Sequence, residues 1–433
     1  MAGNYKGNNS TSPSLYYGWV IVCLSHFTLA FHVVTRFSFG IFQVPLIEEF
    51  EWGRGLLGGA FALSMATYAL GAPLAGSLLD RYGPRAIMPW GSVILGITLI
   101  ASYFISSILE VYLLIGFCLG GGLALSGFAT HSAIMPRWFK QKRGRATGIA
   151  LSGIGIGILF LAPILERLIA LFGWRVTYLI FGMVILFIIA PLGFIFLRDH
   201  PEDVGQGPDG TPPRSEEDFK KIYGDQNKKK GIRDVFREVR HDKRFWFLMI
   251  IVFGIGFNNN TIMSQLALYL IDIKYLPVTA AIIFGSVGFI RTLGSVMGGW
   301  IGDLMGRAYG VSLASFIVGM GIIYLIFLPN FGSSLANGFI FAIIYGTGTG
   351  AMSACYSALC GDCFEGPNYG IIIGFMEIFY GLGGVLGAPF AGFVFDSTKS
   401  YMIPFITISC LMFGALFLAL LLNKTIQQQN NTN

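Results

Sequence analysis

The fold class of this chain is decided by one stretch, Gly76-Ser77-Leu78-Leu79-Asp80-Arg81-Tyr82-Gly83-Pro84-Arg85. It follows an apolar run that is long enough to cross a bilayer. A looser copy, made of Gly299, Asp303, Gly306 and Arg307, follows a second apolar run that ends near Trp300. In both copies the Asp lies four residues after one Gly and three before another. A signature repeated after two apolar runs predicts a duplicated, polytopic membrane protein.

The composition agrees with a membrane protein. Of 433 residues, 54% are hydrophobic and 12% are charged, whereas soluble domains carry about 25% charge. The charges are concentrated: residues 198–244 hold 12 of the 29 Lys and Arg and 11 of the 23 Asp and Glu. The net charge of +6 is therefore assigned to basic loops on one side of a membrane, and not to nucleic-acid binding.

Twelve apolar segments reach the length of a span, which predicts an all-α fold of twelve transmembrane helices in two six-helix bundles. The segments are 17–45, 56–79, 86–107, 110–136, 145–171, 174–197, 245–271, 278–302, 308–328, 333–359, 370–395 and 401–423. Alternate loops carry the Lys and Arg residues, so the positive-inside rule predicts that both termini are cytoplasmic. We expect a multi-pass protein of the plasma membrane, a bacterial inner membrane, that acts as a monomer.

The division into domains follows from these segments. We expect bundles at 17–197 and 245–423, a cytoplasmic linker at 198–244, and disordered tails at 1–16 and 424–433. The Pro- and Gly-rich part, 198–230, predicts a flexible connection. A basic amphipathic helix is expected at 233–244, with its apolar stripe on the inner membrane surface.

Three motifs resemble known transporter families. Gly76, Asp80, Arg81, Gly83 and Arg85 resemble the loop between helices 2 and 3 of the major facilitator superfamily. Tyr16-Tyr17-Gly18-Trp19 and the run Arg137 to Gly153 are similar to the monocarboxylate transporters and the oxalate/formate antiporters. The resemblance covers nearly the whole chain and implies alternating access. It also implies that Arg291, in helix 8, binds substrate.

The sequence departs from those families at two positions. An acidic residue often precedes the helix 8 arginine by one turn, but here that position is Val287. The helix 11 lysine of the oxalate transporters corresponds to Tyr380. Losing that lysine argues against a small dianion, and losing the acid leaves the usual proton site in doubt unless Glu377 replaces it.

The repeated motif is interpreted as a conformational element. Asp80 can sit at the positive N-terminal end of a helix in the other half and stabilise one conformation. Gly83 permits the sharp turn after it. The alternative is that the motif only fixes the structure of the loop. The conformational set is Gly76, Asp80, Arg81, Gly83, Arg85, Asp303 and Arg307.

Charges inside spans are costly and usually functional. Arg291 suits a carboxylate, which its planar fork can hold with two hydrogen bonds. Glu377 lies at a similar depth, so it is either a proton-coupling group or a fixed partner of Arg291. The other substrate-binding candidates are polar side chains in the spans: His32, Arg36, Asn258, Tyr345, Tyr356 and Tyr380.

The leading function is secondary active transport of a small organic anion, a monocarboxylate, by proton symport or anion exchange. Two alternatives remain: an exporter of a larger amphipathic compound such as a drug or siderophore, and a non-transporting receptor on a transporter fold. The sequence contains no nucleophile–base set, metal-ligand cluster or nucleotide loop, so we expect neither an enzyme nor a cofactor or metal. The expected partners are the anion, protons and the lipid bilayer.

Overall fold

The computed structural model describes residues 16–432 except 38, 216–217 and 219–229, and the described residues contain helices but no strands. The helices of the first half are α1 (Gly18–Phe37), α2 (Phe39–Phe50), α3 (Arg54–Tyr82), α4 (Pro84–Ala101), α5 (Ile108–Val111), α6 (Leu119–Ser126), α7 (Phe128–Trp138), α8 (Arg143–Val184) and α9 (Ala190–Phe196). Those of the second half are α11 (Ile232–Val239), α12 (Lys243–Asp272), α13 (Pro277–Met305), α14 (Arg307–Phe327), α15 (Leu335–Phe364), α16 (Tyr369–Thr398) and α17 (Met402–Thr432).

Eleven described segments are long and apolar enough to cross a membrane. One of them, Arg143–Phe196, has 54 residues, more than twice the ~20 that a span requires. Its backbone leaves the helical region at Gly173, where φ is 78°. The chain turns there, so this segment supplies two crossings, which makes twelve crossings within the described residues. The predicted all-α polytopic fold is confirmed.

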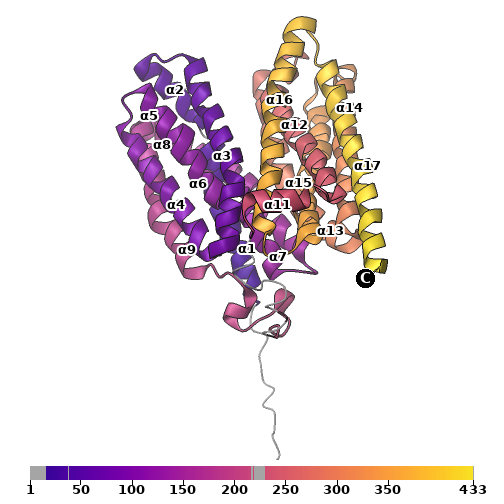
Figure 1. Ribbon diagram of the computed structural model, residues 1–433. Coiled ribbons are helices and arrows are strands. Elements are labelled where there is room, and N and C mark those ends of the chain that lie inside the picture. The colour runs from indigo at the N-terminus through magenta and orange to yellow at the C-terminus, as the bar shows by residue number, and fades with distance from the viewer. Residues whose placement is uncertain (1–15, 38, 216–217, 219–229, 433) are drawn as a thin grey trace, which may run out of the picture.

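The two halves form separate bundles that meet near the linker (Figure 1). Helix α3 packs against α16, and α8 packs against α13. The ribbons of the two halves diverge toward the opposite end of the molecule (Figure 1). We call the end at which the linker lies the linker side.

Glycines allow the two halves to touch at these crossings. A Cβ added to Gly76 would lie 2.0 Å from the carbonyl oxygen of Gly370, and one added to Gly299 would lie 2.1 Å from that of Gly144. No side chain fits at such distances. The glycines of the repeated motif therefore permit close contact between backbones. Gly76 does so where α3 crosses α16, and Gly299 does so where α13 crosses α8.

The linker differs from the flexible segment expected at 198–230. Its first part forms two short 3₁₀ turns, Pro201–Val204 and Pro208–Gly210. Asp199 accepts a hydrogen bond from the backbone N–H of Arg85, and Asp209 accepts from those of Lys140, Gln141 and Lys142. These carboxylates order the segment because they satisfy N–H groups at the beginnings of helices. Burial is the largest influence on Asp199 and raises its pKa.

Two further expectations are corrected, and one lies outside the described chain. The amphipathic helix ends at Val239 instead of continuing to Arg244, because Asp242 caps α12 by accepting from the N–H of Arg244. Helix α17 continues to Thr432, so the tail expected to be disordered is helical. The N-terminal tail, like residues 219–229 of the linker, lies outside the described residues apart from Tyr16.

Candidate functional site

The repeated aspartates join the two halves on the linker side. Asp80 accepts hydrogen bonds from the N–H groups of Gly370 (2.9 Å) and Ile371 (3.0 Å), in the first turn of α16. Asp303 accepts from those of Gly144 (2.7 Å) and Arg145 (2.8 Å), in the first turn of α8. Each carboxylate thus meets the positive end of a helix in the other half. Gly83 and Gly306 follow with φ of 85° and 95°, a region that favours glycine.

A network of ion pairs adds to this contact. Arg143, 2% exposed, binds Asp362 and Glu365 at 2.7 Å each, and Arg307 also pairs with Asp362. Asp362 and Glu365 lie at an acidic connection between α15 and α16, on the side where alternate loops are otherwise basic. Their partners explain the exception: the acids hold an arginine of the first half.

A second cross-half contact lies deeper, around Glu377 of α16. The carboxylate is 3% exposed, and the hydroxyl of Tyr68 in α3 donates to its Oε2 at 2.8 Å. The guanidinium of Arg36 lies 4.6 Å from the centre of the Tyr68 ring and interacts electrostatically with Glu377. Glu377 is therefore held by two residues of the first half.

Arg291 lies apart from that group. Its guanidinium donates to Ser353 Oγ at 3.3 Å and interacts electrostatically with Tyr345. No carboxylate of the described residues lies within ion-pair distance of it. Glu377 and Arg291, which the sequence suggested as a fixed ion pair, therefore do not form one among the described residues. A half-buried cation without an acidic partner can accept an anion.

The polar groups of the second half are linked to one another near Arg291. Tyr345 donates to Asn258 at 3.2 Å, and Asn259 donates to the hydroxyl of Tyr380 at 3.4 Å. The side chain of Asn258 also bonds Asn259, and α12 stays helical through these residues. Tyr356 stacks on Phe128 of the first half, with ring centres 5.8 Å apart.

His32 has a different environment. It is fully buried, and its Nδ1 and Nε2 lie 2.8 Å from the Ser126 carbonyl oxygen and 3.2 Å from Ser92 Oγ. Both partners belong to the first half, so His32 joins α1 to α4 and α6. We leave it out of the proposed site.

Three residues that contact the candidate side chains were not predicted as site residues from the sequence. They are Tyr68, which contacts Glu377, Ser353, which contacts Arg291, and Asn259, which contacts Tyr380. Asn259 carried a signal, since it belongs to a run of three asparagines in one span. Tyr68 carried none, because a lone tyrosine in a span is most often a packing residue.

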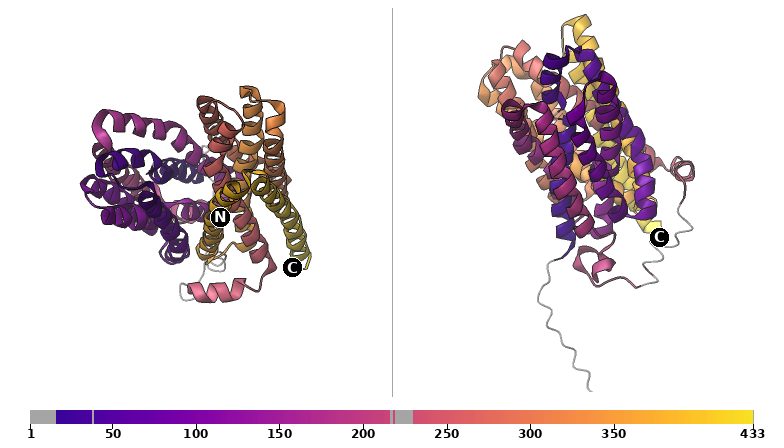
Figure 2. Two further views of the ribbon diagram at one scale, coloured as in Figure 1. Left: turned by 90° about the horizontal axis from the view of Figure 1, so that it is seen from above. Right: turned by 90° about the vertical axis from the view of Figure 1, so that its left-hand side faces the viewer.

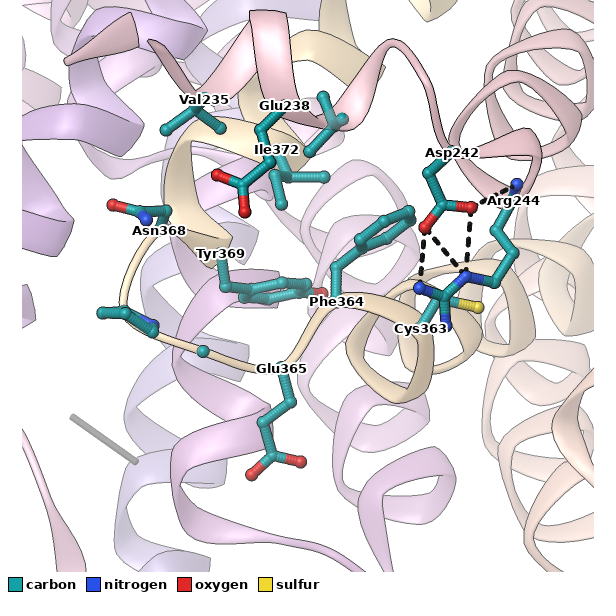
Figure 3. Close-up of a pocket in the computed structure, with 13 residues that line it drawn as sticks. Val235, Glu238, Asp242, Arg244, Cys363, Phe364, Glu365, Asn368, Tyr369 and Ile372 are labelled. Carbon is teal, nitrogen blue, oxygen red and sulfur yellow. Dashed lines mark hydrogen bonds and ion pairs between the residues drawn. The ribbon is translucent and has the colours of Figure 1, made fainter. Parts of the chain in front are cut away.

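A hollow of about 300 Å³ lies elsewhere, between α11 and the loop that joins α15 to α16 (Figure 3). Its charged residues are already paired: Asp242 with Arg244 at 2.6 Å, Glu238 with Lys230 at 2.5 Å, and Glu365 with Arg143. We do not assign the substrate to it, because the charged side chains that line it already have ion-pair partners.

Two membrane bundles that meet through repeated motifs, with polar groups buried between them, define a transporter built by duplication. The sequence model of the Major Facilitator Superfamily matches residues 25–387, with a second match at 292–432. The chain belongs to this superfamily, and it is a transporter, not an enzyme.

Named relatives are similar over nearly the full length. Monocarboxylate transporter 13 of Rattus norvegicus is 25% identical over 420 residues, covering 94% of this chain and 88% of the relative. Monocarboxylate transporter 11 of Homo sapiens is 26% identical, covering 94% and 82%. The uncharacterized MFS-type transporter YcxA of Bacillus subtilis (strain 168) is 25% identical, covering 88% of each chain.

Proposed function

We propose that this transporter moves a small organic anion, a monocarboxylate, by alternating access between bundles 17–197 and 245–423. The observation that carries the proposal is Arg291, a cation inside a span with no acidic partner among the described residues. The similarity to monocarboxylate transporters supports the same substrate class.

Arg291 grips the carboxylate in this mechanism. Its planar fork can form two parallel hydrogen bonds with one carboxylate. The Tyr380 hydroxyl, which accepts from Asn259, can donate a further hydrogen bond, as can the second amide N–H of Asn258. Tyr345 donates to Asn258 and positions its amide, while Tyr356 lies at the contact with the first half. One guanidinium matches one carboxylate, which suits a monoanion.

Glu377 is the proton-coupling group. When it is ionised, Arg36 and the Tyr68 hydroxyl stabilise it across the two halves. Protonation removes the charge, weakens that contact and releases Arg36 to attract an anion. In the alternative mode, anion exchange, Glu377 stays ionised and serves only as a brace. The Tyr68 contact favours symport, because it couples the charge of Glu377 to the contact between halves.

The linker side is placed in the cytoplasm. The loops on that side carry most of the Lys and Arg residues of the loops, including Arg81, Arg85, Lys140 and Lys142. The positive-inside rule places such basic loops in the cytoplasm. The contacts of Asp80 and Asp303 with helices of the other half then close the cytoplasmic end, so the described conformation is closed toward the cytoplasm. Both termini lie in the cytoplasm, and the membrane is the plasma membrane, a bacterial inner membrane.

Uptake by proteoliposomes tests the proposal. Purified protein is reconstituted and given a panel of labelled monocarboxylates, dicarboxylates and neutral analogues, with and without an imposed proton gradient. We expect monocarboxylates to accumulate only with the gradient. Accumulation of neutral amphipathic compounds alone would favour the exporter, and binding without transport would favour the receptor.

A further inference from the structure

A row of arginines without ion-pair partners among the described residues lies on α11 and at the residue that caps its C-terminus. Arg233, Arg237 and Arg240 are spaced by four and three residues, so they share one stripe of the helix, and all three are exposed. None forms an ion pair within the described chain. Glu238 and Asp242 pair with Lys230 and Arg244, and Asp234, the remaining acid of α11, is exposed and forms no ion pair with these arginines among the described residues.

The position of α11 brings this stripe to the membrane. Seen from above, the helix runs across the outside of the bundle instead of beneath it (Figure 2). Helix α12, which begins at Lys243 just after it, is a span. The basic stripe is therefore beside the bundle, at the level where the spans reach the linker side.

Much of the apolar stripe of α11 packs against the protein and not on the membrane surface expected from the sequence, although Phe236 stays 39% exposed. Val235 and Val239 are buried, since α11 packs against α16 and α3. Phe236 contacts the rings of Phe245 and Phe375. The apolar stripe packs helix α11 against the protein, so the arginine stripe faces the surroundings of the protein.

We propose that Arg233, Arg237 and Arg240 bind the headgroups of anionic phospholipids in the linker-side leaflet. Guanidinium groups match phosphate oxygens in a bidentate arrangement, and basic residues beside a span are attracted to anionic lipid. Trp246 is 39% exposed, and its indole N–H donates to the Arg240 carbonyl oxygen. An aromatic at the interface next to the arginines suits the acyl chain below a bound headgroup.

Lipid titration of the purified full-length protein tests this proposal. Dioctanoyl-phosphatidylglycerol and dioctanoyl-phosphatidylcholine are titrated separately, and binding is measured by thermophoresis. We expect the wild type to prefer the anionic lipid. The combined variant Arg233→Gln, Arg237→Gln and Arg240→Gln should reduce that preference by up to about a hundredfold, given about fivefold for each of the three cations near the surface.

A matched variant removes the same charge elsewhere. Lys274→Gln, Lys399→Gln and Lys424→Gln together change three cations outside α11 and should leave the preference intact. An equal loss in both variants, or no loss in the arginine variant, overturns the proposal. Should the arginine variant fail to fold, wild type alone decides: its preference must weaken as salt rises, and a preference that salt leaves unchanged also overturns it.

Discussion

At the scale of single residues, charge and partner decide which polar groups act. Arg291 and Glu377 were both singled out from the sequence as candidates, because ionisable residues are rare in spans and therefore conspicuous. Their partners were not: Glu377 bonds Tyr68 and not Arg291. A side-chain partner 309 positions away along the chain depends on how two bundles dock, which residue spacing within one helix does not encode.

Arg291→Ala should weaken substrate binding by about 2–5 kcal/mol, because a buried charged contact is lost. Arg291→Lys keeps the charge but not the planar fork, so we expect an intermediate loss. Equilibrium binding of a transported monocarboxylate to purified protein measures both. Arg198→Lys, outside the spans, is the control and should bind normally. Wild-type affinity in Arg291→Ala would remove this residue from the site.

Glu377→Gln mimics the protonated carboxylate permanently. The variant should no longer accumulate substrate in response to a proton gradient, yet it should still exchange substrate, since exchange moves no net proton. Tyr68→Phe, which removes only the donor to Glu377, should reduce gradient-driven uptake less severely. Both are measured in proteoliposomes. If Glu377→Gln accumulates substrate like the wild type, Glu377 is a brace and the transporter is an exchanger or is protonated elsewhere.

At the scale of elements, the repeated motif shows what a short pattern can and cannot predict. Its spacing predicted a carboxylate near a helix end in the other half, and Asp80 of α3 accepts hydrogen bonds from two N–H groups in the first turn of α16. The ordering of residues 198–215 was not predicted, because Pro and Gly also suit flexible linkers. Asp199 and Asp209 order this segment by accepting hydrogen bonds from backbone N–H groups. Contacts of this kind cannot be predicted from amino-acid composition.

Asp80→Asn should slow turnover more than it changes substrate affinity. The amide keeps one acceptor but loses the charge that faces the α16 N-terminus, a loss of about 0.3–1 kcal/mol. Asp303→Asn is the matched variant at the other copy of the motif and should act in the same direction. Turnover in proteoliposomes and equilibrium binding are compared. Lost binding with intact turnover would place Asp80 in the substrate site instead.

At the scale of the whole molecule, the twelve-helix fold was the most predictable feature. Span length and charge segregation are properties of long segments, so an error of a few residues at a boundary does not change the number of spans. The relative position of the two halves was not predictable, since both open and closed arrangements satisfy the same apolar pattern. That position depends on the glycine crossings, where backbones touch and no side chain intervenes.

Gly76→Val should therefore shift the whole molecule away from the arrangement closed on the linker side. The new Cβ would lie 2.0 Å from the Gly370 carbonyl oxygen, and such overpacking costs about 1–3 kcal/mol or more. A cost of this size applies only to the closed arrangement, so it changes the ratio of the two populations by about 5- to 150-fold. Distance distributions between spin labels on the linker-side ends of α4 and α14 would report the shift.

Gly58→Val is the control for that measurement. Gly58 lies on the same helix, α3, and a Cβ added there meets nothing within 4 Å, so the same change in helix propensity occurs without a collision. We expect its label distances to match those of the wild type, while Gly76→Val gains a longer linker-side distance. Unchanged distances in Gly76→Val would mean that α3 and α16 can separate locally without moving the two halves, and rigid-body alternation would then be wrong for this transporter.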